Sequence, residues 1–389
     1  MRRIYLDNAS TTPVDEEVLN AMLPYFNVKF GNASSLHRFG LEARDAVERS
    51  REIIAKKINA VPEEIIFTSG GSESDNLALR GIAYAYRNKG NHIITSSIEH
   101  PAVLDTCKAL EEEGFKVSYL KVDKEGFVDL QELESSINKK TILVSIMHGN
   151  NEIGTIQNIK KIGEICEKKG AIFHTDAVQS FTKVPIDVEE MNIGLLSFSG
   201  HKIHGPKGIG GLYVNKSVKL RKLIFGGHQE FDTRPGTENV PAIAGFAKAV
   251  EICNETDIDK MKVLRDRLID GIIKSIPECR LNGAKGERRL CNNVNVSFNY
   301  VDGEALMMEL DNKMIEVSTG SACSSQSKEP SHVLLAIGLK NDAARGAIRA
   351  TLSRFNKKEE IDYFLERLPE IVDNLRQINP LWKGYSRRN

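Results

Sequence analysis

The chain has 389 residues, of which 41% are hydrophobic and 27% charged, proportions that are ordinary for a soluble globular protein. Its 53 basic and 53 acidic residues cancel, so its net charge favours neither nucleic acid nor an anionic membrane as a partner. The length suits two domains of unequal size better than a single core.

Several classes of protein are disfavoured by what the sequence lacks. No apolar run approaches the roughly 20 residues that span a bilayer, and the N-terminus lacks the apolar stretch of a signal peptide. We therefore expect a cytoplasmic protein without a membrane partner. The six cysteines are scattered without a C-x-x-C pair, which disfavours a zinc site or a disulfide framework.

The first two thirds of the chain alternate between short apolar segments and amphipathic ones. An irregular segment, 5–13, is followed by predicted helices at 16–26 and 42–59, with a loop at 31–38 between them. The predicted strands are 65–68, 92–96, 115–122, 141–147, 171–175, 195–198 and 210–214. Between them, helices are predicted from about 72, and at 103–113, 130–137 and 159–168. This alternation indicates an α/β fold whose mostly parallel sheet is covered on both faces.

The pattern changes after Gly226 and Gly227. Helices are predicted at 242–253, 261–275 and 359–376, and strands at 293–298, 315–317 and 347–352. We expect a large domain of residues 15–255, and a smaller α+β domain of residues 1–14 and 256–389.

Lys202 follows an apolar strand and enters a loop that Gly205, Pro206 and Gly208 keep from becoming a helix. Such a lysine fits a phosphate contact or a Schiff base with a carbonyl cofactor, with a surface lysine as the alternative. Upstream, the segment 171–176 is a strand that ends in Asp176. An aspartate that holds the pyridinium nitrogen and a lysine at a neighbouring strand end together favour pyridoxal 5'-phosphate (PLP).

A glycine-rich turn, residues 69–74, lies between a strand and a helix. Free N–H groups at a helix start attract an anion, so this turn is a candidate phosphate site. The alternative is an ordinary helix start capped by Ser72. His100 follows another strand end, where its imidazole could stack on a pyridine ring, shuttle a proton, or be a simple loop residue.

Two further residues have an unusual setting. Cys323 lies in a run of small polar residues, 319–326, which suits an exposed thiolate nucleophile better than a buried structural thiol. An inert loop thiol is the alternative. Arg349 is predicted in mid-strand among small residues, where it needs an anionic partner such as a substrate carboxylate or a structural acid.

Together these segments resemble the NifS/IscS-type cysteine desulfurases, which are fold-type I PLP enzymes of the class V aminotransferase family. The resemblance runs from Tyr5 to Leu381, and its motifs are weak singly but specific in this order. They are Thr68-Ser69-Gly70-Gly71-Ser72-Glu73-Ser74, Glu99-His100, Asn150-Asn151-Glu152-Ile153-Gly154, His174-Thr175-Asp176-Ala177-Val178-Gln179, Ser199-Gly200-His201-Lys202, Arg234-Pro235-Gly236-Thr237-Glu238-Asn239 and Gly320-Ser321-Ala322-Cys323-Ser324-Ser325.

The resemblance implies a role for each site residue. Lys202 would form the Schiff base, Cys323 would accept the sulfur, and His100 would stack on the ring and take part in catalysis. Asp176 would pair with the pyridinium nitrogen, and Gln179 would contact the ring hydroxyl. The implied phosphate ligands are Gly71, Ser72, Ser199 and His201, with Thr237 from a second subunit of a homodimer. Asn151 and Arg349 would hold the cysteine carboxylate. The family often has Ala-Thr where this chain has Gly71-Ser72.

The implied activity converts L-cysteine to L-alanine through an aldimine and a ketimine of PLP, with the sulfur held as a persulfide on Cys323. An iron–sulfur scaffold protein would accept the sulfur, and a tRNA-thiolating enzyme is a second possible acceptor. The stretch 319–330 resembles the branch with a mobile cysteine loop. An aminotransferase or a selenocysteine lyase on the same fold, and a non-catalytic assembly platform, are the alternatives. Cys323 argues against the aminotransferase, and the presence of Lys202 and Cys323 argues against the platform.

Overall fold

The structure is a computed structural model, and it describes residues 3–319 and 330–382. Its larger part is built on a seven-stranded sheet with the order β2-β8-β7-β6-β5-β3-β4. The strands are β2 (Ile65–Thr68), β3 (His92–Ser96), β4 (Lys116–Leu120), β5 (Thr141–Ser145), β6 (Ile172–Asp176), β7 (Leu195–Ser199) and β8 (Gly210–Val214). Only β8 runs antiparallel to its neighbours in this sheet, which confirms the predicted mostly parallel α/β fold.

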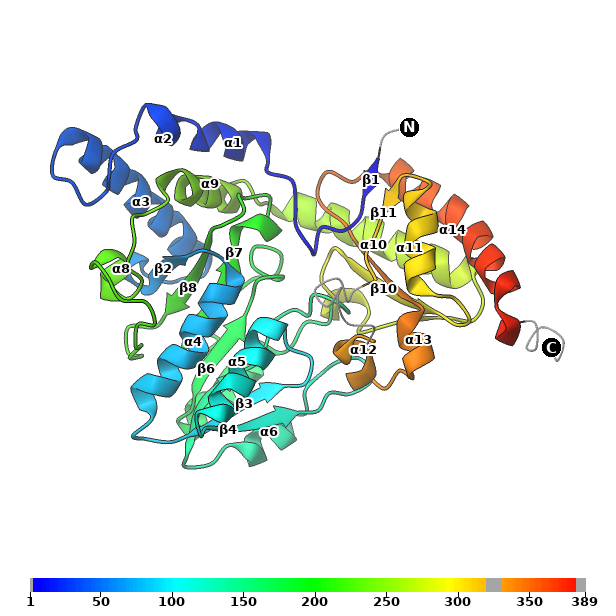
Figure 1. Cartoon of the computed structure of the whole chain (residues 1–389), viewed down its shortest axis with the longest axis horizontal. Helices are drawn as coiled ribbons and strands as arrows, with labels where there is room; N and C mark the ends of the chain where they lie inside the picture. Colours follow the sequence, from blue (N-terminus) through cyan, green and yellow to red (C-terminus); the bar gives the residue numbers. More distant parts are fainter. Residues whose placement is uncertain (1–2, 320–329, 383–389) are drawn as a thin grey trace.

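Helices cover both faces of this sheet (Figure 1). Successive side chains of a strand point to opposite faces, so Leu195 packs into one apolar cluster and Leu196 into another. The helices of this part are α1 (Glu16–Met22), α2 (Pro24–Asn27), α3 (Arg38–Lys57), α4 (Gly71–Tyr86), α5 (Pro101–Glu112), α6 (Leu130–Ser136), α7 (Ile159–Lys169), α8 (Gln229–Asp232) and α9 (Val240–Glu251). Short 3-10 turns lie at η1 (Pro62–Glu64) and η2 (Gly200–Lys202).

A second apolar core lies in the C-terminal part, around an antiparallel sheet of order β12-β10-β9. Its strands are β9 (Cys279–Leu281), β10 (Asn293–Phe298) and β12 (Ala347–Thr351), and its helices and turn are α10 (Glu255–Ser275), η3 (Gly286–Arg288), α11 (Gly303–Asp311), α12 (His332–Ala336), α13 (Asn341–Arg345) and α14 (Lys358–Ile378). The N-terminal strand β1 (Ile4–Tyr5) crosses to this part and pairs in parallel with β11 (Ile315–Glu316) (Figure 1). We propose that the boundary between the two domains follows the separation of these cores.

Local capping explains where the observed helices depart from the predicted ranges. The helix predicted at 16–26 is broken, because α1 ends at Met22 and Pro24 starts a new turn, α2. α3 begins before residue 42 because the side chain of His37 accepts a hydrogen bond from Gly40 N. α10 begins before residue 261 because Asn254 caps Asp257 N. None of the described helices is both long and apolar enough to cross a membrane.

Candidate active site

A cavity of about 370 Å³ lies where the carboxyl ends of the parallel strands meet the N-terminal segment. Brought together in its wall are the predicted site residues Gly71, Ser72, His100, Asn151, Asp176, Gln179, Ser199, His201, Lys202 and Arg349. The sheet explains this convergence, because β5, β6 and β7 are adjacent and parallel and therefore end at one edge.

Asp176 ends one strand and Lys202 follows its neighbour, as their sequence spacing suggested. Lys202 lies in η2, directly after β7, and its Nζ donates to the carbonyl oxygens of Ala9 at 2.6 Å and Ser10 at 2.7 Å. Asp176 ends β6 and its Oδ1 accepts a hydrogen bond from Val178 N at 2.8 Å. Burial raises the pKa of Asp176, while the neighbouring His100 and Lys202 act against that rise.

The glycine-rich turn forms the start of α4. Gly70, at φ 155°, is the N-cap residue and offers no side chain to bind the first N–H groups of the helix. Ser72 lies inside the helix, so the alternative in which it caps the helix is wrong. Ser199 lies opposite this turn, and its buried Oγ has no hydrogen-bond partner among the described residues. Open N–H groups, a helix dipole and an unpaired hydroxyl together suit a phosphate group.

His100 is the N-cap of α5, with its Nδ1 accepting a hydrogen bond from Ala102 N at 3.1 Å. Burial lowers the pKa of His100, which favours a neutral imidazole that can stack on an aromatic ring. On another wall, burial and the nearby Lys202 lower the pKa of His201 to about 4. Its Nδ1 lies 3.1 Å from Thr11 Oγ1, which is part of the N-terminal segment.

Arg349 projects from β12 of the second core into the same cavity. Its Nη2 donates to Asp7 Oδ1 at 2.8 Å and to Ser10 Oγ at 2.9 Å, and its Nη1 donates to the carbonyl of Asn151 at 3.2 Å. The Nε of Arg349 is buried and has no hydrogen-bond partner among the described residues. An arginine fork with an unused donor beside Asn151 suits the carboxylate of a small substrate.

Two predicted site residues do not lie in this wall. Thr237 is exposed and does not line the cavity within its own subunit. Cys323, in the segment 320–329, lies outside the described residues.

The sequence analysis missed other residues that line the cavity, chiefly Ala9, Ser10, Asp75, Met147 and Val178. Asp75 is the clearest omission, because it is a buried carboxyl one turn into α4, four residues after Gly71. Burial and the neighbouring Asp176 raise the pKa of Asp75 well above its usual value. Its helical spacing from Gly71 was a signal that could have found it.

The residues that line the cavity fit PLP. The phosphate would lie between the start of α4, Ser199 and His201, and the ring nitrogen would give the buried carboxyl of Asp176 the cationic partner that stabilises its charge. Lys202 supplies an amine in the same cavity for the aldehyde carbon. Gln179 lines the same cavity, and its Nε2 donates a hydrogen bond to the carbonyl oxygen of Ala9 at 3.0 Å.

The fold and this site belong to a known family. Residues 4–364 match the aminotransferase class-V family, and the chain belongs to it. Among curated relatives, cysteine desulfurase IscS of Clostridium botulinum (strain Hall) is 52% identical over 388 residues, covering 99% of this chain and 98% of the relative. The protein of the same name from Dictyoglomus turgidum is 50% identical over 388 residues, covering 98% of each.

Solved structures agree with this assignment. A NifS-like protein superposes with a TM-score of 0.90 at 41% identity, covering 96% of this chain and 100% of the other. A structure described as SspA in complex with cysteine has a TM-score of 0.82 at 41% identity, covering 91% of this chain and 100% of the other. The expected fold-type I architecture is thereby confirmed.

Proposed function

We propose that this chain is a PLP-dependent cysteine desulfurase that converts L-cysteine to L-alanine and holds the sulfur as a persulfide on Cys323. The observation that carries the proposal is the single cavity that joins a lysine, a buried aspartate, an open helix start and an arginine fork. Relatives named cysteine desulfurase IscS, at about half identity over nearly the whole chain, support the same activity.

Each residue then has a defined task. Bound PLP supplies an electron sink that labilises the bonds at the substrate Cα and Cβ. Arg349 and Asn151 hold the substrate carboxylate, while Asp176 keeps the ring nitrogen protonated and His100 covers the ring face. The Nζ of Lys202, in the same cavity wall, would carry the proton to and from the substrate Cα. These assignments rest on the placement of all five residues in one wall.

The Cys323 thiolate takes the sulfur from the substrate. That thiolate attacks the substrate sulfur, an S–S bond forms, and the C–S bond breaks with its electron pair staying on the three-carbon fragment. Protonation of that fragment yields L-alanine. The persulfide then passes to an acceptor, for which we propose an iron–sulfur scaffold protein and, as a second acceptor, a tRNA-thiolating enzyme.

We also propose that the enzyme is a cytoplasmic homodimer whose phosphate site includes Thr237 of the partner subunit. Two segments of this chain, residues 26–41 and 224–231, expose many apolar side chains, and a dimer would cover them. The two segments also line one cavity of about 460 Å³, at Ala33, Ser34, His228 and Phe231. The exposed apolar residues of this surface, the 26–41/224–231 surface, are Phe26, Val28, Phe30, Leu36, Phe39, Leu41, Ile224, Phe225 and Phe231.

The activity is tested with the full-length protein, L-cysteine and a reductant, by measuring alanine, sulfide and the visible absorption of bound PLP. We expect the wild type to form both products, Lys202→Ala to lose the absorption band, and Cys323→Ala to keep the band but release no sulfide. Equal sulfide release by Cys323→Ala and the wild type would refute the persulfide step and favour a selenocysteine lyase, whereas an aminotransferase would release no sulfide.

A further inference from the structure

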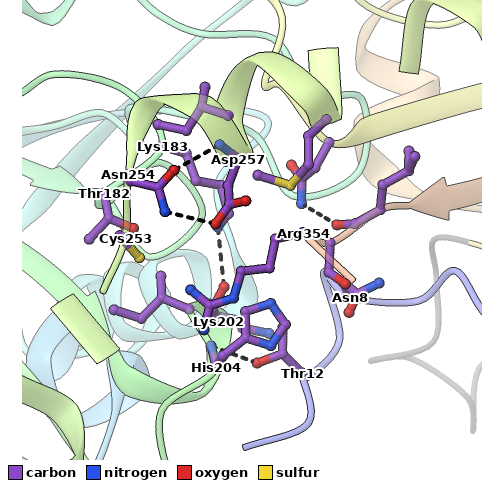
Figure 2. Close-up of a pocket in the computed structure, with 16 residues that line it drawn as sticks. Asn8, Thr12, Thr182, Lys183, Lys202, His204, Cys253, Asn254, Asp257 and Arg354 are labelled. Carbon is purple, nitrogen blue, oxygen red and sulfur yellow. Dashed lines mark hydrogen bonds between the residues drawn. The ribbon is translucent and has the colours of Figure 1, made fainter. Parts of the chain in front are cut away.

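A second lysine, Lys183, contacts the backbone of Lys202 through its side chain. Both lysines line a small cavity of about 40 Å³ (Figure 2), and Lys202 also lines the proposed cofactor cavity. The Nζ of Lys183 donates to the carbonyl oxygen of Gln179 at 2.9 Å and to that of Lys202 at 3.3 Å. One side chain therefore connects the turn after β6 with the turn after β7.

These two turns and the strand ends before them carry five of the nine proposed cofactor-binding residues. Asp176 ends β6 and Gln179 lies in the turn after it, while Ser199 ends β7 and His201 and Lys202 lie in the turn after it. The register between β6 and β7 ends at Asp176 and Ser197, and Ala177 N adds one more hydrogen bond to the Ser197 carbonyl. The contact made by Lys183 extends the connection between the two strands beyond the sheet, to the residues that touch the cofactor.

The backbone just before Lys183 is strained. Thr182 is buried and has a φ of 65°, a left-handed conformation that is unusual for a β-branched residue. Such strain is unfavourable and persists where the surrounding structure requires it. The next residue, Lys183, makes the two backbone contacts described above.

The charge of Lys183 is not neutralised by an ion pair. Among residues 3–319 and 330–382, no carboxylate lies within 4.0 Å of its Nζ. Burial lowers the pKa of Lys183, while Cys291 and Cys253 act in the opposite direction. Its charge reaches the cofactor side of the loop, where it is one of the groups that lower the pKa of His201. The other ionisable groups around it in the small cavity are Lys202, His204, Cys253, Asp257 and Arg354.

We propose that Lys183 is a positioning residue of the cofactor site, which binds the Gln179 and Lys202 carbonyl oxygens and thereby holds the two turns together. Its ammonium group also places a second positive charge near the Lys202 amine. This inference rests on the proposed function, because it assumes that PLP binds at Lys202. A neutral apolar residue could fill the space, but it could neither bind the two carbonyls nor supply a positive charge that disfavours protonation of the Lys202 nitrogen.

The test compares the full-length wild type with Lys183→Met, Lys183→Arg and a control, Lys168→Met, in which an exposed lysine with 74% side-chain exposure is removed. PLP affinity, the pH titration of the bound-PLP absorption band and the thermal midpoint are measured. For Lys183→Met we expect PLP affinity to fall ~10-fold and the pKa of the absorption band to rise by ~1 unit. Lys183→Arg should restore most of the titration, and Lys168→Met should match the wild type.

The outcomes separate the two proposals. If Lys183→Met binds PLP and titrates like the wild type, the positioning role is refuted while the proposed function stands. A lower thermal midpoint with unchanged affinity and titration would mean a structural role only, which also refutes it. If the wild type itself binds no PLP, both proposals fail. Should Lys183→Met not fold, Lys183→Gln decides, because its amide can still donate to a carbonyl but carries no charge, so an unchanged pKa of the absorption band in that variant would refute the proposal.

Discussion

Glu99 shows how strongly single side chains are perturbed around this site. It is fully buried, it accepts hydrogen bonds from Met147 N and Ser96 Oγ, and burial raises its pKa to about 8. Asp75 and Asp176 are buried carboxyls in the same region, and both have raised pKa values. The site therefore concentrates acidic groups that resist ionisation, a pattern typical of functional sites.

The raised pKa of Glu99 predicts a pH dependence of stability. The folded state holds a proton that the unfolded state releases above about pH 4.5, so the stability present below that pH is lost as pH rises toward 8. Between pH 5 and 8 we expect a loss of roughly 4 kcal/mol from this group. Glu99→Gln should flatten the curve of unfolding free energy against pH, measured by chemical denaturation.

The control for this experiment is Glu112→Gln, since Glu112 is an exposed carboxyl at the end of α5. Its curve should run parallel to that of the wild type. Parallel curves for Glu99→Gln and the wild type would show that Glu99 does not carry the titration.

At the scale of elements, the start of α4 is fitted closely against the turn after β6. A Cβ added to Gly71 would lie 2.7 Å from Val178 Cγ2, closer than two such atoms can approach. This chain combines a glycine at position 71 with a valine at position 178. The pair sets how near the helix start and its open N–H groups come to the cofactor cavity.

This fit predicts a compensating pair of substitutions. Gly71→Ala should lower stability by about 1–3 kcal/mol through overpacking and weaken PLP binding, because Val178 must move within the cavity wall. Gly71→Ala/Val178→Ala should recover both properties, and Val178→Ala alone is the matched control. Thermal unfolding and PLP titration of the four proteins form a double-mutant cycle, and strictly additive effects would contradict the contact.

For the whole molecule, the proposed dimer is expected to cover the 26–41/224–231 surface, whose apolar side chains are exposed in the single chain. Phe30 is 62% exposed and stacks on Phe39 with ring centroids 5.2 Å apart. Nearby, Arg51 binds Glu230 in a buried pair, which anchors the left-handed turn at residues 230–232 before Thr237. The proposed dimer would cover this apolar surface and bring Thr237 of one subunit to the phosphate of the other.

Breaking the dimer should therefore also weaken the cofactor site. We expect Phe30→Asp to shift the protein from dimer to monomer, measured by light scattering. PLP affinity should also fall, because the phosphate site of a monomer lacks the Thr237 that the partner subunit would supply. Met308→Asp, at a 61% exposed residue of α11, serves as the control and should remain dimeric. A monomeric Phe30→Asp protein with undiminished PLP affinity would contradict the shared site.

The sequence alone was sufficient for the features that depend on local pattern and chemical type. The strand-helix alternation predicted the α/β fold, because the spacing of apolar residues along the chain shows which side chains of each strand or helix are buried. It also predicted that Lys202 and Asp176 lie together, because adjacent parallel strands end at one edge of a sheet. The roles of the site residues and the domain boundaries remain predictions, and the resemblance to a family supplied most of those roles.

Only the tertiary structure decided contacts between segments far apart in the chain. The helix boundaries moved because single side chains such as His37 and Asn254 cap their own neighbours. Asp7 and Ser10 reach Arg349 because β1 crosses to pair with β11. Lys183 reaches the Lys202 carbonyl because two turns fold side by side at a strained residue. Such contacts depend on how distant segments pack, and no periodicity in the sequence encodes that packing.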